Sequence, residues 1–138
     1  SIEYRFSLMS TIFSKIISGE LPSFNVAEDE YHIAILDIFP LVYGHVLVIP
    51  KKEVDYIFDI SSNEYLALFK FAKKVAAAMQ KAISCKRIGI SVIGLEVPHT
   101  HIHLIPINSV SDMNFDKPKL KFADYKMDQI AQKINSFI

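Results

Sequence analysis

The chain has 138 residues, of which 51% are hydrophobic and 12% aromatic, which excludes a disordered chain and suffices for one domain with a substantial core. Lys and Arg together number 15, as do Asp and Glu, and this zero net charge excludes a general binder of nucleic acid or of membrane surfaces. The single cysteine, Cys85, allows no disulfide within the chain, so we expect a cytoplasmic protein. Residues 1–8 are interpreted as an N-terminal extension or an expression remnant, before a single domain over residues 9–138.

The first half of the chain predicts one short helix and three strands. Residues 11–17 have the pattern of an amphipathic helix, which Gly19 ends. Residues 24–27 and 32–36 read as strands on either side of an acidic turn. Residues 45–49 are apolar on both faces, so we expect a central strand there.

The second half predicts a long helix, two strands and a C-terminal helix. Ser61 and Glu64 form a plausible capping box for a helix that ends near Ser84. Its apolar residues recur at spacings of three and four: Tyr65, Phe69, Ala72, Ala76, Met79 and Ile83. Residues 88–93 and 97–107 predict two more strands. The last helix is marked by Met127, Ile130, Ala131 and Ile134. Strands grouped around one long helix favour an α+β fold over a doubly wound α/β fold.

Three of the five histidines alternate with other residues in the run His99-Thr100-His101-Ile102-His103. Alternate side chains of a strand share a face, so this spacing predicts three imidazoles stacked on one side. A neutral imidazole can attack an electrophilic phosphorus, and its neighbours can stabilise the oxyanions that develop. The middle ring, His101, is therefore the predicted nucleophile, and we expect it to be exposed in a pocket.

The residues alone leave alternatives open. His-x-His on a strand is also a zinc-binding pattern, so phosphate chemistry and metal binding fit the triplet about equally, with an incidental His-rich strand as a third reading. His45, after Gly44, either joins the triplet or is a satisfied core histidine, while His32 reads as structural or surface. Asp37 is either a turn former or a carboxylate for ribose hydroxyls, and Glu96 is either a rim charge or an acid near the leaving group. Three apolar residues are core residues by default and could instead line a slot for a base: Phe13, Ile16 and Leu21.

Three blocks in the same order resemble the histidine triad (HIT) superfamily and its Hint branch. Residues 99–105 resemble the signature in which three histidines alternate with apolar residues. Residues 11–22 resemble the opening of Hint proteins, and residues 36–40 with 44–52 resemble their first strand pair. The resemblance implies an α+β, HIT-like fold: an antiparallel sheet of about five strands, a long central helix and a C-terminal helix. It also implies a homodimer in which the sheet continues across the subunits.

The resemblance implies a nucleotide site under the triplet strand. His101 matches the nucleophile that forms a nucleotidyl-histidine intermediate, and His103 matches the residue that contacts the α-phosphate. His99 and His45 match the histidines that complete the site, and Asp37 matches the carboxylate that holds the ribose. The base-pocket positions of the family match Phe13, Ile16, Leu21, Ile35 and Ile38.

The chain also departs from these relatives. Many of them have an N-terminal Cys-x-x-Cys that helps to bind zinc, but the matching positions here are Thr11 and Ser14, and Glu53 stands at a further ligand position. We therefore predict no metal site and no tightly bound cofactor, with Mg²⁺ only as an optional companion of a polyphosphate substrate. Leu95 replaces an expected glutamine, and Glu96 stands where Hint enzymes often have serine or threonine.

The resemblance implies an enzyme that cleaves nucleoside 5′-phosphoramidates or dinucleoside polyphosphates at the α-phosphorus. The phosphoramidase reading is preferred because the N-terminal block resembles Hint. The alternative is a purine nucleotide-binding or interaction module with weak catalysis. It is favoured by the missing glutamine and by the missing asparagine of a loop that relatives have before the triplet, where the run 88–97 is shorter here. The expected partners are a purine nucleotide and a second copy of the chain, with no nucleic acid and no membrane.

Overall fold

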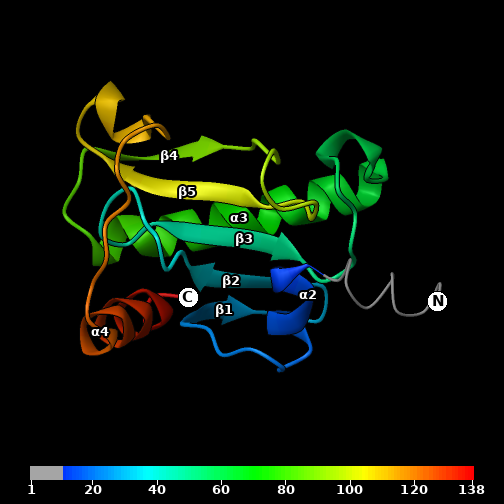
Figure 1. Ribbon diagram of the computed structural model, residues 1–138, viewed down its shortest axis with the longest axis horizontal. Coiled ribbons are helices and arrows are strands. Elements are labelled where there is room, and N and C mark those ends of the chain that lie inside the picture. The colour runs from blue at the N-terminus through cyan, green and yellow to red at the C-terminus, as the bar shows by residue number, and fades with distance from the viewer. Residues whose placement is uncertain (1–10) are drawn as a thin grey trace.

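The computed structural model describes residues 11–138, which form a five-stranded antiparallel sheet with helices against both of its faces (Figure 1). Across the sheet the strand order is β1-β2-β3-β5-β4. The strands are β1 (Asn25–Glu28), β2 (His32–Leu36), β3 (Val46–Pro50), β4 (Arg87–Ser91) and β5 (Ile102–Ile107). The helices are α2 (Ile12–Ile17), η1 (Ile57–Asp59), α3 (Ser62–Ala82), η2 (Val110–Met113) and α4 (Asp124–Asn135). The predicted α+β architecture is confirmed, whereas residues 1–8 lie outside the described residues.

The long helix α3 begins where predicted but buries a different face. Ser61 accepts a hydrogen bond from the Glu64 N–H at 3.3 Å, as an N-cap should, while the Glu64 carboxylate accepts one from Lys52 at 3.2 Å. Of the predicted apolar face, only Ala72 and Met79 are fully buried. The buried stripe is shifted by about one position: Leu68, Phe71, Ala72, Val75, Ala78, Met79 and Ala82. A helix that lies on one face of a sheet buries one narrow stripe, and the bulky residues beside that stripe remain half-exposed.

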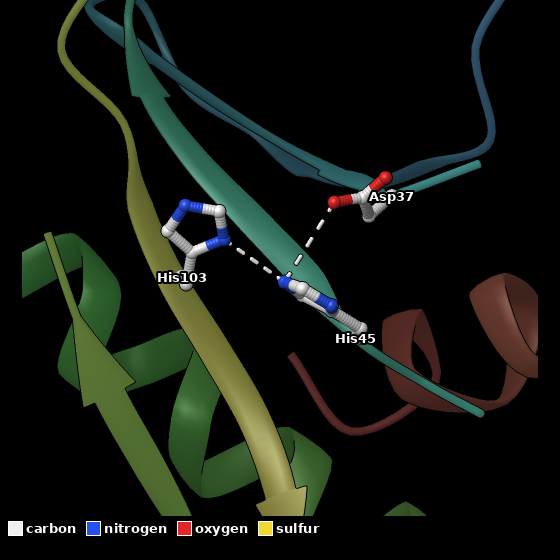
Figure 2. A group of neighbouring side chains, drawn as sticks. All are labelled: Asp37, His45 and His103. Carbon is white, nitrogen blue, oxygen red and sulfur yellow. Dashed lines mark hydrogen bonds and ion pairs between the residues drawn. The ribbon is translucent and has the colours of Figure 1, made fainter. Parts of the chain in front are cut away.

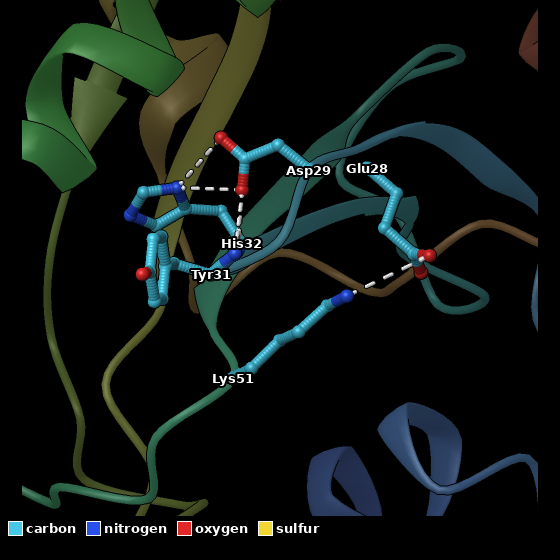
Figure 3. A network of polar contacts seen from close by, with 5 residues as sticks. All are labelled: Glu28, Asp29, Tyr31, His32 and Lys51. Atoms are coloured by element: carbon cyan, nitrogen blue, oxygen red, sulfur yellow. Dashed lines mark hydrogen bonds and ion pairs between the residues drawn. The ribbon is translucent and has the colours of Figure 1, made fainter.

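The turn between β1 and β2 is held by Asp29. Its carboxylate accepts hydrogen bonds from the backbone N–H groups of Tyr31 and His32 at 2.9 and 2.7 Å, and it contacts His32 Nδ1 at 3.0 Å (Figure 3). Burial raises the pKa of Asp29, but the bonds from His32 and Tyr31 outweigh it and lower that pKa below its usual value. His32 is buried and stacks on Phe71 with 5.1 Å between the ring centroids, so it is structural.

The last two strands are shorter than predicted. β4 ends at Ser91, and β5 begins at Ile102 rather than at residue 97. The reason lies at Thr100, whose backbone N–H and hydroxyl both donate to the Val54 carbonyl, at 2.7 and 2.6 Å. These bonds tie the segment before β5 to a loop instead of to a neighbouring strand. Of the three alternating histidines, only His103 therefore lies in a strand.

The alternation of side chains along β3 separates two surfaces. Val46 and Val48 face α3 and α4, whereas Leu47 and Ile49 face α2. His103 is the register partner of Leu47, so its side chain lies on the α2 face of the sheet. Within residues 11–138, no helix is long and apolar enough to cross a bilayer.

Candidate functional site

Three of the sequence-predicted site residues meet on the α2 face, where β2, β3 and β5 lie side by side (Figure 2). Asp37 directly follows β2, and His45 directly precedes β3, so the antiparallel register brings them together. His45 Nε2 lies 3.0 Å from His103 Nδ1 and 3.8 Å from Asp37 Oδ2. The rings of His101 and His103 are 4.9 Å apart between their centroids.

Gly44 allows the chain to enter β3 beside His45. Its φ angle of +88° lies in the left-handed region, which favours glycine. A Cβ atom at this position would stand 2.5 Å from Ile83 Cδ1. The positive φ angle is thus the main requirement for glycine, and the missing Cβ also leaves room for the tip of the Ile83 side chain.

A backbone amide sets the protons on His45 and His103. The Leu41 N–H donates to His45 Nδ1 at 3.1 Å, so the proton of a neutral His45 sits on Nε2. That Nε2–H donates to His103 Nδ1 at 3.0 Å, which places the proton of His103 on its own Nε2. Hydrogen bonds therefore run in one direction from Leu41 through two imidazoles.

Burial keeps both of these rings neutral. Desolvation, helped by the neighbouring His103 and by Lys119, lowers the pKa of His45 to about 3. Desolvation, helped by His101 and Lys119, lowers the pKa of His103 to about 4. At neutral pH the pair therefore carries one proton on each ring and no charge.

His101 is ordered by the carbonyl of His99. Its Nδ1–H donates to the His99 oxygen at 2.7 Å, so Nε2 holds the lone pair. Burial lowers the pKa of His101, which favours the neutral ring. Among residues 11–138, no hydrogen bond is made to Nε2 of His101 or of His103. Two imidazole nitrogens, one with a lone pair and one with a proton, are thus left for a ligand.

The expected exposure of His101 is wrong. His101 and His103 are 7% and 8% exposed, because Phe13 covers one ring at 4.9 Å and Phe115 covers the other at 4.8 Å between centroids. His45 is more deeply buried, at 1%. Only a small part of His101 and of His103 therefore reaches the surface.

His99 does not stack with the other two rings, which corrects the predicted arrangement. Its Nε2–H donates to the Pro50 carbonyl at 2.8 Å, and its Nδ1 accepts from the Thr11 hydroxyl at 3.1 Å. Thr11 is also the N-cap of α2, where it accepts the Ser14 N–H at 3.0 Å. The His99 ring therefore fastens α2 to the end of β3, and only its carbonyl serves His101. Sequence reasoning missed this use of Thr11.

The apolar residues predicted to line a base pocket divide into two groups. Phe13 and Ile35 are buried in one cluster on the α2 face, with Ile16 packed against it. Leu21 and Ile38 are 37% and 49% exposed and do not belong to this cluster. Ile38 lines a separate cavity of about 530 Å³ between residues 22–24, Phe39 and α4.

Asp37 is a turn former that also lies at the site, while its predicted role toward ribose hydroxyls stays a prediction. Its Oδ1 accepts the Phe39 N–H at 2.9 Å, which is the bond of a turn former. Its Oδ2 lies near His45 and is held in the site. Burial raises the pKa of the Asp37 carboxyl, against the opposing effects of the Phe39 N–H and Lys119.

A segment that carries no sequence signal crosses the site. We call residues 114–120 the strap. Its Phe115 ring lies 4.8 Å from the His103 ring and 6.3 Å from the His45 ring between centroids. The Leu120 N–H donates to the Pro40 carbonyl at 2.9 Å, which anchors the strap to the loop that contains Asp37. Aromatic and basic residues are common in loops, so nothing in the sequence distinguished this one.

Asp37, His45 and His103 form a set of groups that could hold a metal ion, since their ligand atoms lie within 4.8 Å of one another. The proton order disfavours this use. A metal on His45 Nε2 would move the proton of a neutral ring to Nδ1, where the Leu41 N–H already points. The absence of a metal site stays a prediction, which this hydrogen-bond pattern favours.

Comparisons of the sequence and of the structure with known proteins find relatives of one kind. An uncharacterized HIT-like protein of Borreliella burgdorferi is 35% identical over 132 residues, covering 90% of this chain and 95% of the relative. Adenosine 5′-monophosphoramidase HNT1 of Saccharomyces cerevisiae is 38% identical over 96 residues, covering 69% of this chain and 61% of the relative. A crystal structure of a Hit-like protein from Bartonella henselae superposes with a TM-score of 0.81 at 30% identity, covering 94% of this chain and 96% of that protein.

The profile of the HIT domain matches residues 18–110, which span His45, the three alternating histidines and all five strands. α2, the whole strap and α4 lie outside the match. The resemblance seen in the sequence is therefore confirmed, and this chain belongs to the histidine triad (HIT) family.

Proposed function

We propose that this protein hydrolyses nucleoside 5′-phosphoramidates at the α-phosphorus through a nucleotidyl-His101 intermediate. The observation that carries the proposal is which ring nitrogen holds the proton in His101 and in His103. His101 presents a lone pair on Nε2, and His103 carries a proton on Nε2. One nitrogen is suited to attack phosphorus and the other to donate to a phosphoryl oxygen.

The proposed reaction has two displacements at phosphorus. In the first, a bond forms between His101 Nε2 and the α-phosphorus as the bond to the leaving amine breaks, and the amine departs with a proton taken from solvent water. In the second, water attacks the same phosphorus, loses a proton to solvent as the bond to His101 Nε2 breaks, and a nucleoside monophosphate and neutral His101 are released. The His103 Nε2–H stabilises the negative phosphoryl oxygens in both steps.

The proposal also includes a choice of leaving group. An amine is the first choice because the yeast relative is named a monophosphoramidase and because the N-terminal block resembles Hint proteins. A dinucleoside polyphosphate is the second choice, with Mg²⁺ as a companion of that substrate. We propose the cluster that contains Phe13, Ile16 and Ile35 as one wall of a purine site, with Asp37 holding the ribose.

Single-turnover labelling tests this function. Wild-type protein is mixed in excess with an adenosine phosphoramidate labelled at the α-phosphorus and is quenched in denaturant. We expect an acid-labile label on the protein that is then lost as AMP. Label that remains absent at every quench time, together with no AMP release, would contradict the enzyme.

A purine nucleotide-binding module with weak catalysis is the second candidate. Leu95, at the position of the expected glutamine, is 89% exposed and offers no polar side-chain atom. Glu96 is exposed and adds a negative charge beside a site for phosphate. AMP binding without any label in the same experiment would favour this candidate.

The Asp37→Ala variant is expected to weaken nucleoside binding more than it slows chemistry. The carboxylate is proposed to accept hydrogen bonds from ribose hydroxyls, which are present in both the ground state and the transition state. We expect KM for an adenosine phosphoramidate to rise roughly tenfold while kcat falls less than threefold. Steady-state kinetics measure both constants, and an unchanged KM would reduce Asp37 to a turn former.

The homodimer also stays a proposal. β4 is an edge strand of the sheet, and its residues are mostly half-buried or exposed, including Ile90 at 51%. Pairing of two β4 strands would continue the sheet from one copy to the next and would cover this edge.

A further inference from the structure

The proposed site lacks a positive charge among its histidines. His45 and His103 are neutral at pH 7, because burial lowers the pKa of each far below neutrality. A nucleotide nevertheless brings at least one negative charge on its α-phosphate. Among residues 11–138, Lys119 is the cation whose charge acts on His45, His103 and Asp37.

The strap holds the ammonium group of Lys119 in a defined place. Nζ donates hydrogen bonds to the carbonyl oxygens of Phe115 and Lys117, and it lies 5.8 Å from the centroid of the Phe115 ring. The same ring also lies against the rings of His103 and His45. The ammonium group of Lys119 thus lies next to the Phe115 ring, which covers His103, the histidine proposed to contact the phosphate.

We propose that Lys119 is a specificity-determining residue, held by the strap beside the phosphoryl site so that the site prefers a charged nucleotide to an uncharged nucleoside. The inference deepens the proposed function and rests on it. The family match ends at residue 110, so Lys119 and the strap lie in the part of the chain beyond the matched domain. Because Lys119 is exposed, solvent and salt weaken its field, and a moderate effect is expected.

Binding of AMP and of adenosine to wild type, Lys119→Met, Lys119→Arg and Lys117→Met tests the inference by calorimetry. Lys117→Met removes the same charge from the same strap, but Lys117 is not among the charges that lower the pKa of His45 or His103. We expect Lys119→Met to weaken AMP binding roughly three- to tenfold at low salt and adenosine binding less than twofold. Lys119→Arg should restore AMP binding to within about twofold, and Lys117→Met should change neither ligand by more than about twofold.

Each other outcome has a distinct meaning. If wild type binds AMP and becomes labelled while Lys119→Met binds AMP as well as wild type, the inference is overturned and the proposed function stands. Equal losses for AMP and adenosine, or equal losses in Lys119→Met and Lys117→Met, would also overturn it. If wild type neither binds AMP nor becomes labelled, the proposed function fails and the inference fails with it.

Discussion

The His101→Asn variant is expected to lose at least about 10⁴-fold in the turnover of an adenosine phosphoramidate while it keeps its fold. Asparagine removes the nucleophilic Nε2 but retains an amide N–H that can donate to the His99 carbonyl in place of Nδ1–H. A smaller side chain at this 7% exposed position loses some packing against Phe13, so a modest loss of stability is expected as well. Steady-state turnover and the urea midpoint measure the two effects separately.

A matched control is His103→Asn. This change also removes an imidazole from the site, but the proposed nucleophile remains. We expect a loss of roughly 10²- to 10³-fold, with label still trapped on the protein, because only a donor to the phosphoryl oxygens is gone. His101→Asn that retained the label, or that kept activity within tenfold of wild type, would exclude His101 as the nucleophile. AMP binding within about fivefold of wild type would show that the His101→Asn site is intact.

The sequence predicted the parts of the site that depend on local pattern. The apolar run of β3 and the positions of Asp37 and His45 at strand ends follow from alternation and turn residues, and the antiparallel register then brings those two side chains together. The positive φ angle of Gly44, just before His45, is likewise a property of a single residue. The general α+β architecture required no more than the order of these local patterns.

The parts that sequence reasoning missed depend on contacts between distant residues. Thr11 and His99 are 88 positions apart in the chain, and their hydrogen bond turns the first histidine of the triplet toward α2. Thr100 bonds to the Val54 carbonyl, so strand alternation does not apply to the first two histidines. The strap is held at the site by contacts such as the bond from Leu120 to Pro40, 80 positions earlier in the chain. Neither spacing nor composition encodes such pairings.

The hydrogen bonds from Leu41 to His103 explain why the site needs His45, whose 1% exposed ring has little surface for a substrate. A backbone amide cannot change its protonation near neutral pH, so it fixes the tautomer of His45 and, through it, the tautomer of His103. The cost of this arrangement is two buried imidazoles that must remain neutral. That cost predicts how the stability of the protein depends on pH.

The free energy of unfolding is expected to fall steeply with acid, by on the order of 3 kcal/mol between pH 6.5 and pH 5. The folded pKa values of His45 and His103, about 3 and about 4, lie below the unfolded value of 6.5. Between these values the unfolded chain binds more protons than the folded chain. The stability from the two neutral rings is therefore fully present above pH 6.5 and is lost as the pH falls toward their folded pKa values.

Urea unfolding at a series of pH values measures this slope. The window above pH 5 limits interference from ordinary carboxylates, and Asp37 acts in the opposite direction because its folded pKa is raised. In His103→Gln one of the two rings is gone while an acceptor for the His45 Nε2–H remains, so the slope should fall by roughly half. NMR titration of the ring carbons gives an independent reading, with no protonation of His45 expected above pH 5. A flat stability profile, or ring resonances of both histidines that titrate near pH 6.5, would mean that burial does not lower the pKa values of the imidazole pair.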